Sequence, residues 1–393
     1  MINSSYTPAI RFKGFADVWE QRKLRDEAIE MLAGGDIDKS KIVENGKYPI
    51  YANALTNDGI VGYYDDYYRV KAPAVTVTGR GDVGHAQART VDFTPVVRLL
   101  TIRSEHDAYF LENAINNHSV IVESTGVPQL TVPQLENYMI QFPKTIEEET
   151  KIGEYFRNLD NLITLHQRKL QKLSNIKKSM LEKMFPKNGS NVPEIRFNGF
   201  TEAWEQRKLG EVGTTYTGLS GKTKEDFGHG NGQFVTYMNV FSNPVGLPDM
   251  TEAVEIDDSQ NKVLFGDVLF TTSSETPEEV GMSSVWLENA ENTYLNSFCF
   301  GYRPTVEFNP YYLAYMLRSS SMRKKITFLA QGISRYNISK NKMLDIEIPI
   351  PKIEEQKQIG SYFRNLDNLI TLHQRKLEKL QNIKKAFLEK MFV

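Results

Sequence analysis

The sequence repeats itself, and this repeat restricts the possible folds more than any other feature. Residues 10–24 (IRFKGFADVWEQRKL) recur as residues 195–209 (IRFNGFTEAWEQRKL). Residues 153–185 recur as residues 360–392, with 28 of 33 positions identical. The period of about 200 residues is too long for a solenoid, whose repeats are ~20–45 residues. The chain is therefore predicted to be a tandem duplication. The nearly identical segments form a constant frame, and they flank a variable segment in each copy.

The second repeated segment predicts a long helix in each copy. Apolar residues recur at alternating three- and four-residue steps, and no proline or glycine interrupts residues 154–185 before Pro186. A helix of 33 residues spans roughly 50 Å, and its single apolar stripe needs a partner. We expect an antiparallel coiled coil with the variable domains at opposite ends; the alternative is two helices that each lie on their own domain. The predicted seam comprises Leu159, Leu162, His166, Leu173, Ile176 and Met180, with their copies Leu366, Leu369, His373, Leu380, Ile383 and Phe387.

Polar and charged residues on these helices allow more than one role. His166 and His373 occupy equivalent seam positions, where setting the register of the pair is favoured over metal binding. Each repeated helix carries seven Lys or Arg against three Asp or Glu. A basic face that includes Lys177 and its copy Lys384 is predicted to contact DNA, to be solvated or to contact a protein partner.

The two variable segments are predicted to be mixed, β-rich domains. Runs of β-branched and aromatic residues between Gly and Asp turns indicate strands within residues 48–86 and 233–304, and one helix is expected near 108–117 and one near 310–325. The fold class is α+β with pseudo-two-fold duplication. The expected boundaries are 1–143 for the first variable domain, 144–185 for the first spacer helix, 186–194 for a linker, 195–350 for the second variable domain and 351–393 for the second spacer helix.

Composition excludes several classes of protein. The 393 residues are 40% hydrophobic and 24% charged, which is typical of folded domains. Cys299 is the single cysteine, so neither an internal disulfide nor a cysteine metal framework is possible. No signal peptide or stretch of ~18 apolar residues is present, so we expect a cytoplasmic protein without membrane contact. The net charge of −2 rules out a uniformly basic surface.

No motif predicts a catalytic or metal site. Residues 79–84 fit G-x-G-x-x-G, but no helix pattern follows, so a turn between strands is favoured over a phosphate loop. Asn309-Pro310-Tyr311-Tyr312 is similar to a methyltransferase box with its second proline missing, and a helix N-cap followed by proline explains it. Residues 221–223 end like a P-loop, but the required first glycine is replaced by Tyr216.

The order of motifs resembles that of the specificity subunits of type I restriction-modification enzymes. The second copy runs from Gln331-Gly-Ile-Ser-Arg through Ile348-Pro-Ile-Pro351 to Ile353-Glu-Glu-Gln before its long helix. The first copy has Gly126-Val-Pro-Gln, Ile140-Gln-Phe-Pro143 and Ile146-Glu-Glu-Glu in the same order. Glu149 and Thr150 depart from Gln356 and Lys357 of the second copy, and little effect on the start of the first helix is expected.

The resemblance implies a non-catalytic subunit that selects a DNA sequence. Its variable domains would be target-recognition domains, each reading half of a bipartite site in double-stranded DNA. Two modification (methyltransferase) subunits and the restriction subunits would be its partners, and these would carry S-adenosylmethionine, ATP and Mg²⁺, with no cofactor in this chain. The alternative is a coiled-coil adaptor with two protein-binding domains. A stand-alone methyltransferase would need a cofactor fold and a catalytic box, and the sequence shows neither.

Polar residues in predicted loops are the candidates for DNA contact, because binding residues often lie on loops and Arg can donate hydrogen bonds to guanine. These candidates are Arg80, Gln87 and Arg89 in the first domain, and Ser220, Lys222, Lys224, Thr272, Ser274, Arg335 and Tyr336 in the second.

Overall fold

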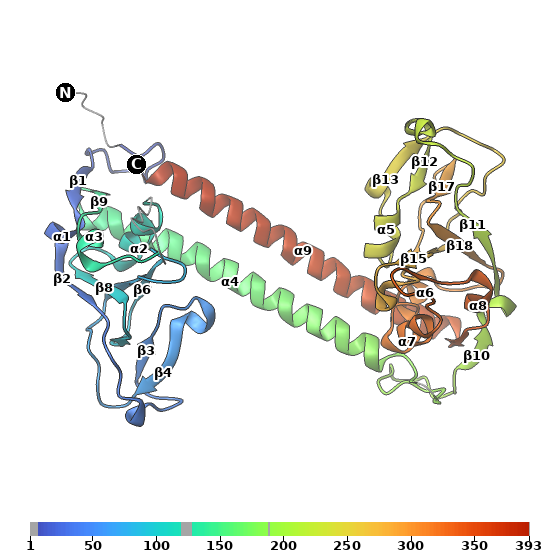
Figure 1. Ribbon diagram of the computed structural model, residues 1–393, viewed down its shortest axis with the longest axis horizontal. Coiled ribbons are helices and arrows are strands. Elements are labelled where there is room, and N and C mark those ends of the chain that lie inside the picture. The colour runs from blue at the N-terminus through green and yellow to red at the C-terminus, as the bar shows by residue number, and fades with distance from the viewer. Residues whose placement is uncertain (1–6, 119–127, 188, 393) are drawn as a thin grey trace. The chain divides into compact units, whose positions relative to one another are not determined.

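A computed structural model describes residues 7–118, 128–187 and 189–392 of the chain. By contacts, the chain forms two compact units. The first unit comprises residues 1–168 and 374–393, and the second unit comprises residues 169–373. Each unit therefore contains the start of one long helix and the end of the other (Figure 1).

The long helices are α4 (Ile146–Lys183) and α9 (Ile353–Met391). Both begin at equivalent residues, so the departures at Glu149 and Thr150 do not move the start of the first helix. Acidic residues occupy the first turn of each helix and a lysine the last turn, which complements the helix dipole.

Within each unit the two helices pair antiparallel, as predicted. In the first unit the start of α4 meets the end of α9, where the Asp160 carboxylate accepts a 2.6 Å hydrogen bond from the ammonium of Lys384. In the second unit the end of α4 meets the start of α9, where the ammonium of Lys177 lies 2.5 Å from a carboxylate oxygen of Asp367. These are the same two positions in both copies, so part of the basic helix face holds the helices together.

The stripe that faces the partner helix differs from the predicted seam at one position in each copy. Leu162 and Leu369 are 44% exposed, whereas the adjacent Ile163 and Ile370 are half-buried. Neighbouring residues lie ~100° apart around a helix, so one of each pair lies on the more covered face and the other points into solvent. The remaining seam residues are buried or half-buried.

The first unit is built on three sheets, with strand orders β2-β8-β5-β6, β4-β3-β7 and β1-β9. Its strands are β1 (Glu20–Lys23), β2 (Ala28–Ala33), β3 (Tyr48–Tyr51), β4 (Ile60–Tyr64), β5 (Ala74–Thr78), β6 (Ala86–Arg89), β7 (Thr94–Pro95), β8 (Leu99–Ser104) and β9 (Met139–Phe142). Its short helices are α1 (Leu24–Glu27), α2 (Ala108–Asn116) and α3 (Val132–Glu136).

The second unit has corresponding sheets β11-β18-β14-β16, β13-β12-β17 and β10-β20, and an additional pair β15-β19. Its strands are β10 (Glu205–Lys208), β11 (Gly213–Thr217), β12 (Phe227–Val235), β13 (Thr251–Val254), β14 (Val268–Thr271), β15 (Ser273–Ser274), β16 (Ser283–Val285), β17 (Thr293–Leu295), β18 (Cys299–Pro304), β19 (Tyr336–Asn337) and β20 (Glu347–Ile350). Its short helices are α5 (Tyr237–Ser242), α6 (Pro310–Met316), α7 (Ser320–Phe328) and α8 (Lys340–Leu344).

The single helix expected near residues 310–325 is two helices, α6 and α7. The break has a local cause, because the hydroxyl of Ser319 accepts from the backbone N–H of Met322 and caps α7. Upstream, the side chain of Asn309 caps α6 and Pro310 occupies its first turn, as predicted.

In both units, an arginine of the repeated N-terminal motif (residues 10–24 and 195–209) forms an ion pair with a glutamate at the start of a long helix. The guanidinium of Arg11 donates to both carboxylate oxygens of Glu148, at 2.6 and 2.7 Å. Arg196 makes the same paired contact with Glu355, at 2.6 and 2.8 Å. Both carboxylates are about 1% exposed, so each is buried with its charge paired.

Candidate nucleic-acid interface

The glycine-rich segment of the first unit is a turn between strands, as predicted. It joins the antiparallel strands β5 and β6, and the backbone N–H of Gly84 donates to the carbonyl of Thr78 at 2.8 Å. Gly81 and Gly84 have φ values of +77° and +87°, which residues other than glycine rarely adopt. The turn presents Arg80 as an exposed side chain.

The loop after the central strand occupies the same place in both units. In the first unit the carbonyl of Gly79, just after β5, accepts a 3.0 Å hydrogen bond from the N–H of Leu130. In the second unit the carbonyl of Thr272, just after β14, accepts a 3.0 Å hydrogen bond from the N–H of Ile338. Arg80 and the segment 272–275 are therefore equivalent in the duplicated fold, although their sequences are unrelated.

Arg89 lies inside the first unit and is only 4% exposed. Its guanidinium stacks 3.6 Å from the ring centroid of Tyr51 and donates to the hydroxyl of Thr76 at 3.0 Å. Burial lowers the pKa of Arg89, partly offset by Tyr51 and by Asp58. Gln87 accepts a 2.7 Å hydrogen bond from Arg89 and donates to Asp58. This placement favours a supporting role for both residues, and the sequence could not reveal which face of β6 is covered.

The three candidates in residues 220–224 have different surroundings. The ammonium of Lys222 lies 2.8 Å from a carboxylate oxygen of Asp257, and its side chain is 12% exposed. The backbone of Ser220 exchanges two hydrogen bonds with the side chain of Gln260, at 3.0 and 3.1 Å. Lys224 is exposed, so it is the best placed of the three for contact with a phosphate.

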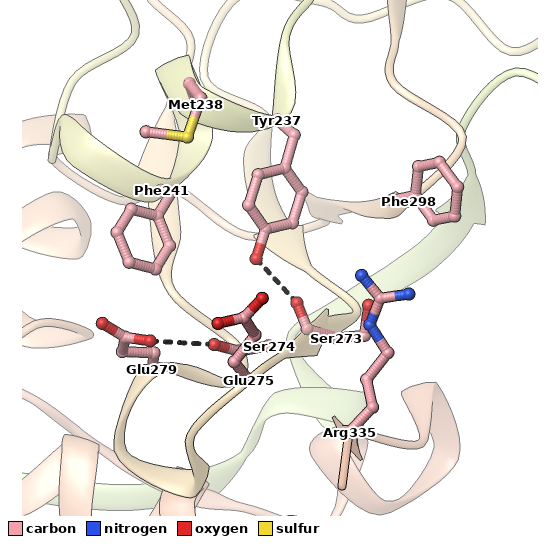
Figure 2. Close-up of a pocket in the computed structure, with 9 residues that line it drawn as sticks. All are labelled: Tyr237, Met238, Phe241, Ser273, Ser274, Glu275, Glu279, Phe298 and Arg335. Atoms are coloured by element: carbon pink, nitrogen blue, oxygen red, sulfur yellow. Dashed lines mark hydrogen bonds between the residues drawn. The ribbon is translucent and has the colours of Figure 1, made fainter.

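The structure brings together the four remaining candidates of the second unit. Strands β15 and β19 pair antiparallel, with Ser274 opposite Tyr336, and the N–H of Ile338 donates to the carbonyl of Thr272. The segments that contain Thr272, Ser274, Arg335 and Tyr336 therefore lie side by side. A pocket of about 320 Å³ opens there. Figure 2 shows its lining residues, which are Tyr237, Met238, Phe241, Ser273, Ser274, Glu275, Glu279, Phe298 and Arg335.

Hydrogen bonds fix the loop that forms this pocket. The hydroxyl of Tyr237 donates to the carbonyl of Ser273 at 2.6 Å, as Figure 2 shows. Glu279 accepts from the hydroxyls of Ser274 and Thr276, at 3.1 and 3.0 Å. The pocket is therefore held in place by its own side chains rather than assembled by a ligand.

Four apolar lining residues were not among the sequence candidates: Tyr237, Met238, Phe241 and Phe298. Met238 and Phe298 are 54% and 60% exposed, so they present apolar surface to solvent at this pocket. The one sequence signal was Phe298, an aromatic residue in a polar turn after Asn296 and Ser297. Tyr237 and Phe241 lie one turn apart on α5. A strand was predicted through residues 233–240, but it ends at Val235 and the side chain of Thr236 caps a helix.

No cluster of three or more histidine, cysteine, aspartate or glutamate side chains able to hold a metal occurs in residues 7–118, 128–187 and 189–392. Within the same ranges, no helix combines the length and apolar character needed to cross a bilayer.

Sequence comparisons find the same domain twice. The profile of the type I restriction modification DNA specificity domain matches residues 17–175 and 201–382. The MjaVIII type I restriction enzyme specificity subunit of Methanocaldococcus jannaschii is 24% identical over 296 residues, or 68% of this chain and 64% of that protein. The StySPI specificity subunit of Salmonella potsdam is 26% identical over 190 residues, or 47% of this chain and 41% of that protein. The alignments thus span less than two thirds of each relative's length.

Solved structures share the fold. The S subunit of a type I restriction-modification system from M. genitalium superposes with a TM-score of 0.59 at 15% identity, covering 98% of this chain and 99% of that one. A chain from a study of the assembly and conformational transition of the type I R-M system superposes with a TM-score of 0.51 at 17% identity, covering 97% and 99%.

Proposed function

Since the chain belongs to the type I restriction-modification DNA specificity family, we propose that it selects the DNA sequence on which the other subunits of such a complex act. Each unit reads one part of a bipartite, asymmetric site in double-stranded DNA. The chain itself carries out no chemistry, and S-adenosylmethionine, ATP and Mg²⁺ are bound by its partner subunits.

One observation carries this proposal: a constant frame holds unlike loops at the same place. Gly79, which precedes Arg80, and Thr272 follow equivalent strands and accept hydrogen bonds from Leu130 and Ile338, which are equivalent residues of the two copies. Base sequence is read by side chains at base edges, while phosphate contacts only position the protein. Two unlike loops on one duplicated frame thus suit an asymmetric site in two parts.

The proposal is tested by exchanging residues 25–142 for the corresponding segment of another family member. Genome-wide mapping of methylated bases, in cells that contain the modification subunits, should show that one half of the methylated sequence changes and the other half does not. A change in both halves would contradict independent reading by the two units. Unchanged methylation together with retained partner binding would favour the adaptor function instead.

The modification subunits are proposed to dock on the outward faces of the long helices. Leu162 and Leu165 on α4 are 44% and 45% exposed, and their copies Leu369 and Leu372 on α9 are 44% and 46% exposed. Exposed apolar residues that recur in both copies of a repeat are typical of a surface that binds a partner twice. Two equivalent patches therefore fit two identical subunits.

We expect Leu162→Glu combined with Leu165→Glu to weaken binding of one modification subunit, because burying an unpaired carboxylate at an interface is costly. Co-purification followed by mass measurement should give a complex with one modification subunit instead of two. Glu substitutions at the exposed Thr164 and Gln167 serve as the control on the same helix. Retention of both subunits by the leucine variant would place the docking surface elsewhere.

A further inference from the structure

The pocket of the second unit contains two opposite charges that are not paired with each other. Glu275 and Arg335 both line it and are both exposed. Neither makes a hydrogen bond or ion pair with any residue in the described part of the chain. The neighbouring carboxylate of Glu279 is different, because hydroxyl groups of Ser274 and Thr276 already donate to it.

These two side chains have complementary hydrogen-bonding capacity. A carboxylate only accepts hydrogen bonds, and a guanidinium only donates them. A carboxylate at a DNA-facing site repels phosphates, so it is suited to an amine donor on a base rather than to the backbone. In the major groove a C·G pair offers that donor at cytosine N4, together with two acceptors at guanine O6 and N7.

We infer that this pocket reads one C·G base pair in the part of the site assigned to the second unit, with Glu275 accepting from cytosine N4 and Arg335 donating to guanine. This inference rests on the proposed function and adds the base pair that is recognised.

The walls and the support of the pocket fit this role. Tyr237, Phe241 and Phe298 provide apolar surface in the same pocket as Glu275 and Arg335, as Figure 2 shows. When DNA covers these exposed groups, the apolar walls keep water out, and hydrogen bonds that form there are strengthened. The loop is fixed by Tyr237 and by the pairing of β15 with β19, so it loses little conformational entropy when DNA binds.

The test compares Glu275→Gln and Arg335→Ala with wild type in cells that contain the modification subunits. Methylated bases are mapped across the genome. Each variant should accept other base pairs at one C·G position in the second unit's half of the site, with discrimination there reduced about tenfold or more. The other half of the site should be read as before.

Glu278→Gln is the matched control, because Glu278 is exposed in the same loop but does not line the pocket. Unchanged preference at every position in both variants would overturn the inference while leaving the proposed function intact. The same holds if co-purification with the modification subunits is weakened while the methylated sequence is unchanged, since the pocket would then be a protein contact. If wild type directs methylation to no split sequence, the proposed function fails and the inference with it.

Discussion

At the scale of single residues, the two copies differ at a position where the difference has a physical partner. Glu149 in the first unit accepts a 3.2 Å hydrogen bond from the N–H of Asp107, and Gln356 in the second accepts a 3.0 Å bond from the N–H of Asn309. Glu149 has an additional contact, because His106 lies 2.9 Å from it. The carboxylate is therefore matched to a histidine that the second copy lacks.

His106 makes the stability of the first unit dependent on pH. Burial opposes its charged form, but hydrogen bonds with Glu149 and Glu27 raise the pKa of His106 above the ordinary 6.5. A raised pKa stabilises the fold fully below about pH 6.5, and this contribution is lost as the pH rises through the raised value. Burial also raises the pKa of Glu112 to about 7, so only a comparison with a variant isolates the effect of His106.

We expect Glu149→Gln to lower the free energy of unfolding by about 1–3 kcal/mol at pH 6, and by less at pH 8. Denaturant unfolding of both proteins across this range checks the prediction. The reverse change in the second copy, Gln356→Glu, should cost about 3 kcal/mol at neutral pH because it buries a carboxylate with no histidine beside it. A pH-independent difference for Glu149→Gln would show that His106 is not charged in the fold.

At the scale of elements, each long helix ends in the unit of the opposite repeat. Phe392, after α9, packs in the first unit with Trp19 and Phe110, at ring distances of 6.2 and 5.5 Å. Phe185, after α4, packs in the second unit with Trp204 and Tyr312, at 6.4 and 5.9 Å. Each hydrophobic core therefore needs residues from both copies of the repeat.

Truncating these rings should destabilise the unit that contains them rather than the repeat that encodes them. Phe392→Ala should cost about 3–5 kcal/mol and Phe185→Ala a similar amount, as for other buried phenylalanines. Hydrogen exchange checks the location: Phe392→Ala should speed exchange in β2 and β8, and Phe185→Ala in β11 and β18. Faster hydrogen exchange in the second unit for Phe392→Ala would contradict the packing of the end of α9 in the first unit.

At the scale of the whole molecule, charge is unevenly distributed along the sequence. The chain has a net charge of −2, although each repeated helical segment carries a net charge of +4. Two of the lysines in these segments, Lys177 and Lys384, are paired with aspartates of the partner helix. Outside these two segments the chain carries a net charge of −10, so its surface as a whole does not attract phosphates. Phosphate contacts supply essentially all of the non-specific affinity for DNA and a large share of the specific affinity.

The chain without its partners should therefore bind its DNA site weakly. We expect the dissociation constant to be micromolar or weaker at about 150 mM salt, in the range of non-specific binding, and to fall steeply when modification subunits are added. Titration of a labelled duplex at several salt concentrations measures both the affinity and its salt dependence. Nanomolar binding by the chain alone would show that its own surface supplies the phosphate contacts.

The sequence by itself determined the duplicated frame, the two antiparallel long helices and the turn at residues 79–84, because these depend on identity between segments, on periodicity and on local backbone chemistry. It also placed Ser274, Arg335 and Tyr336 among the candidates. Only the tertiary structure decided that Arg89 is buried, that Ile163 is half-buried where Leu162 is exposed, and that Tyr237 and Phe298 line the same pocket as Arg335. These features depend on which face of a strand or helix is covered and on contacts between distant segments, and neither is encoded in a local pattern.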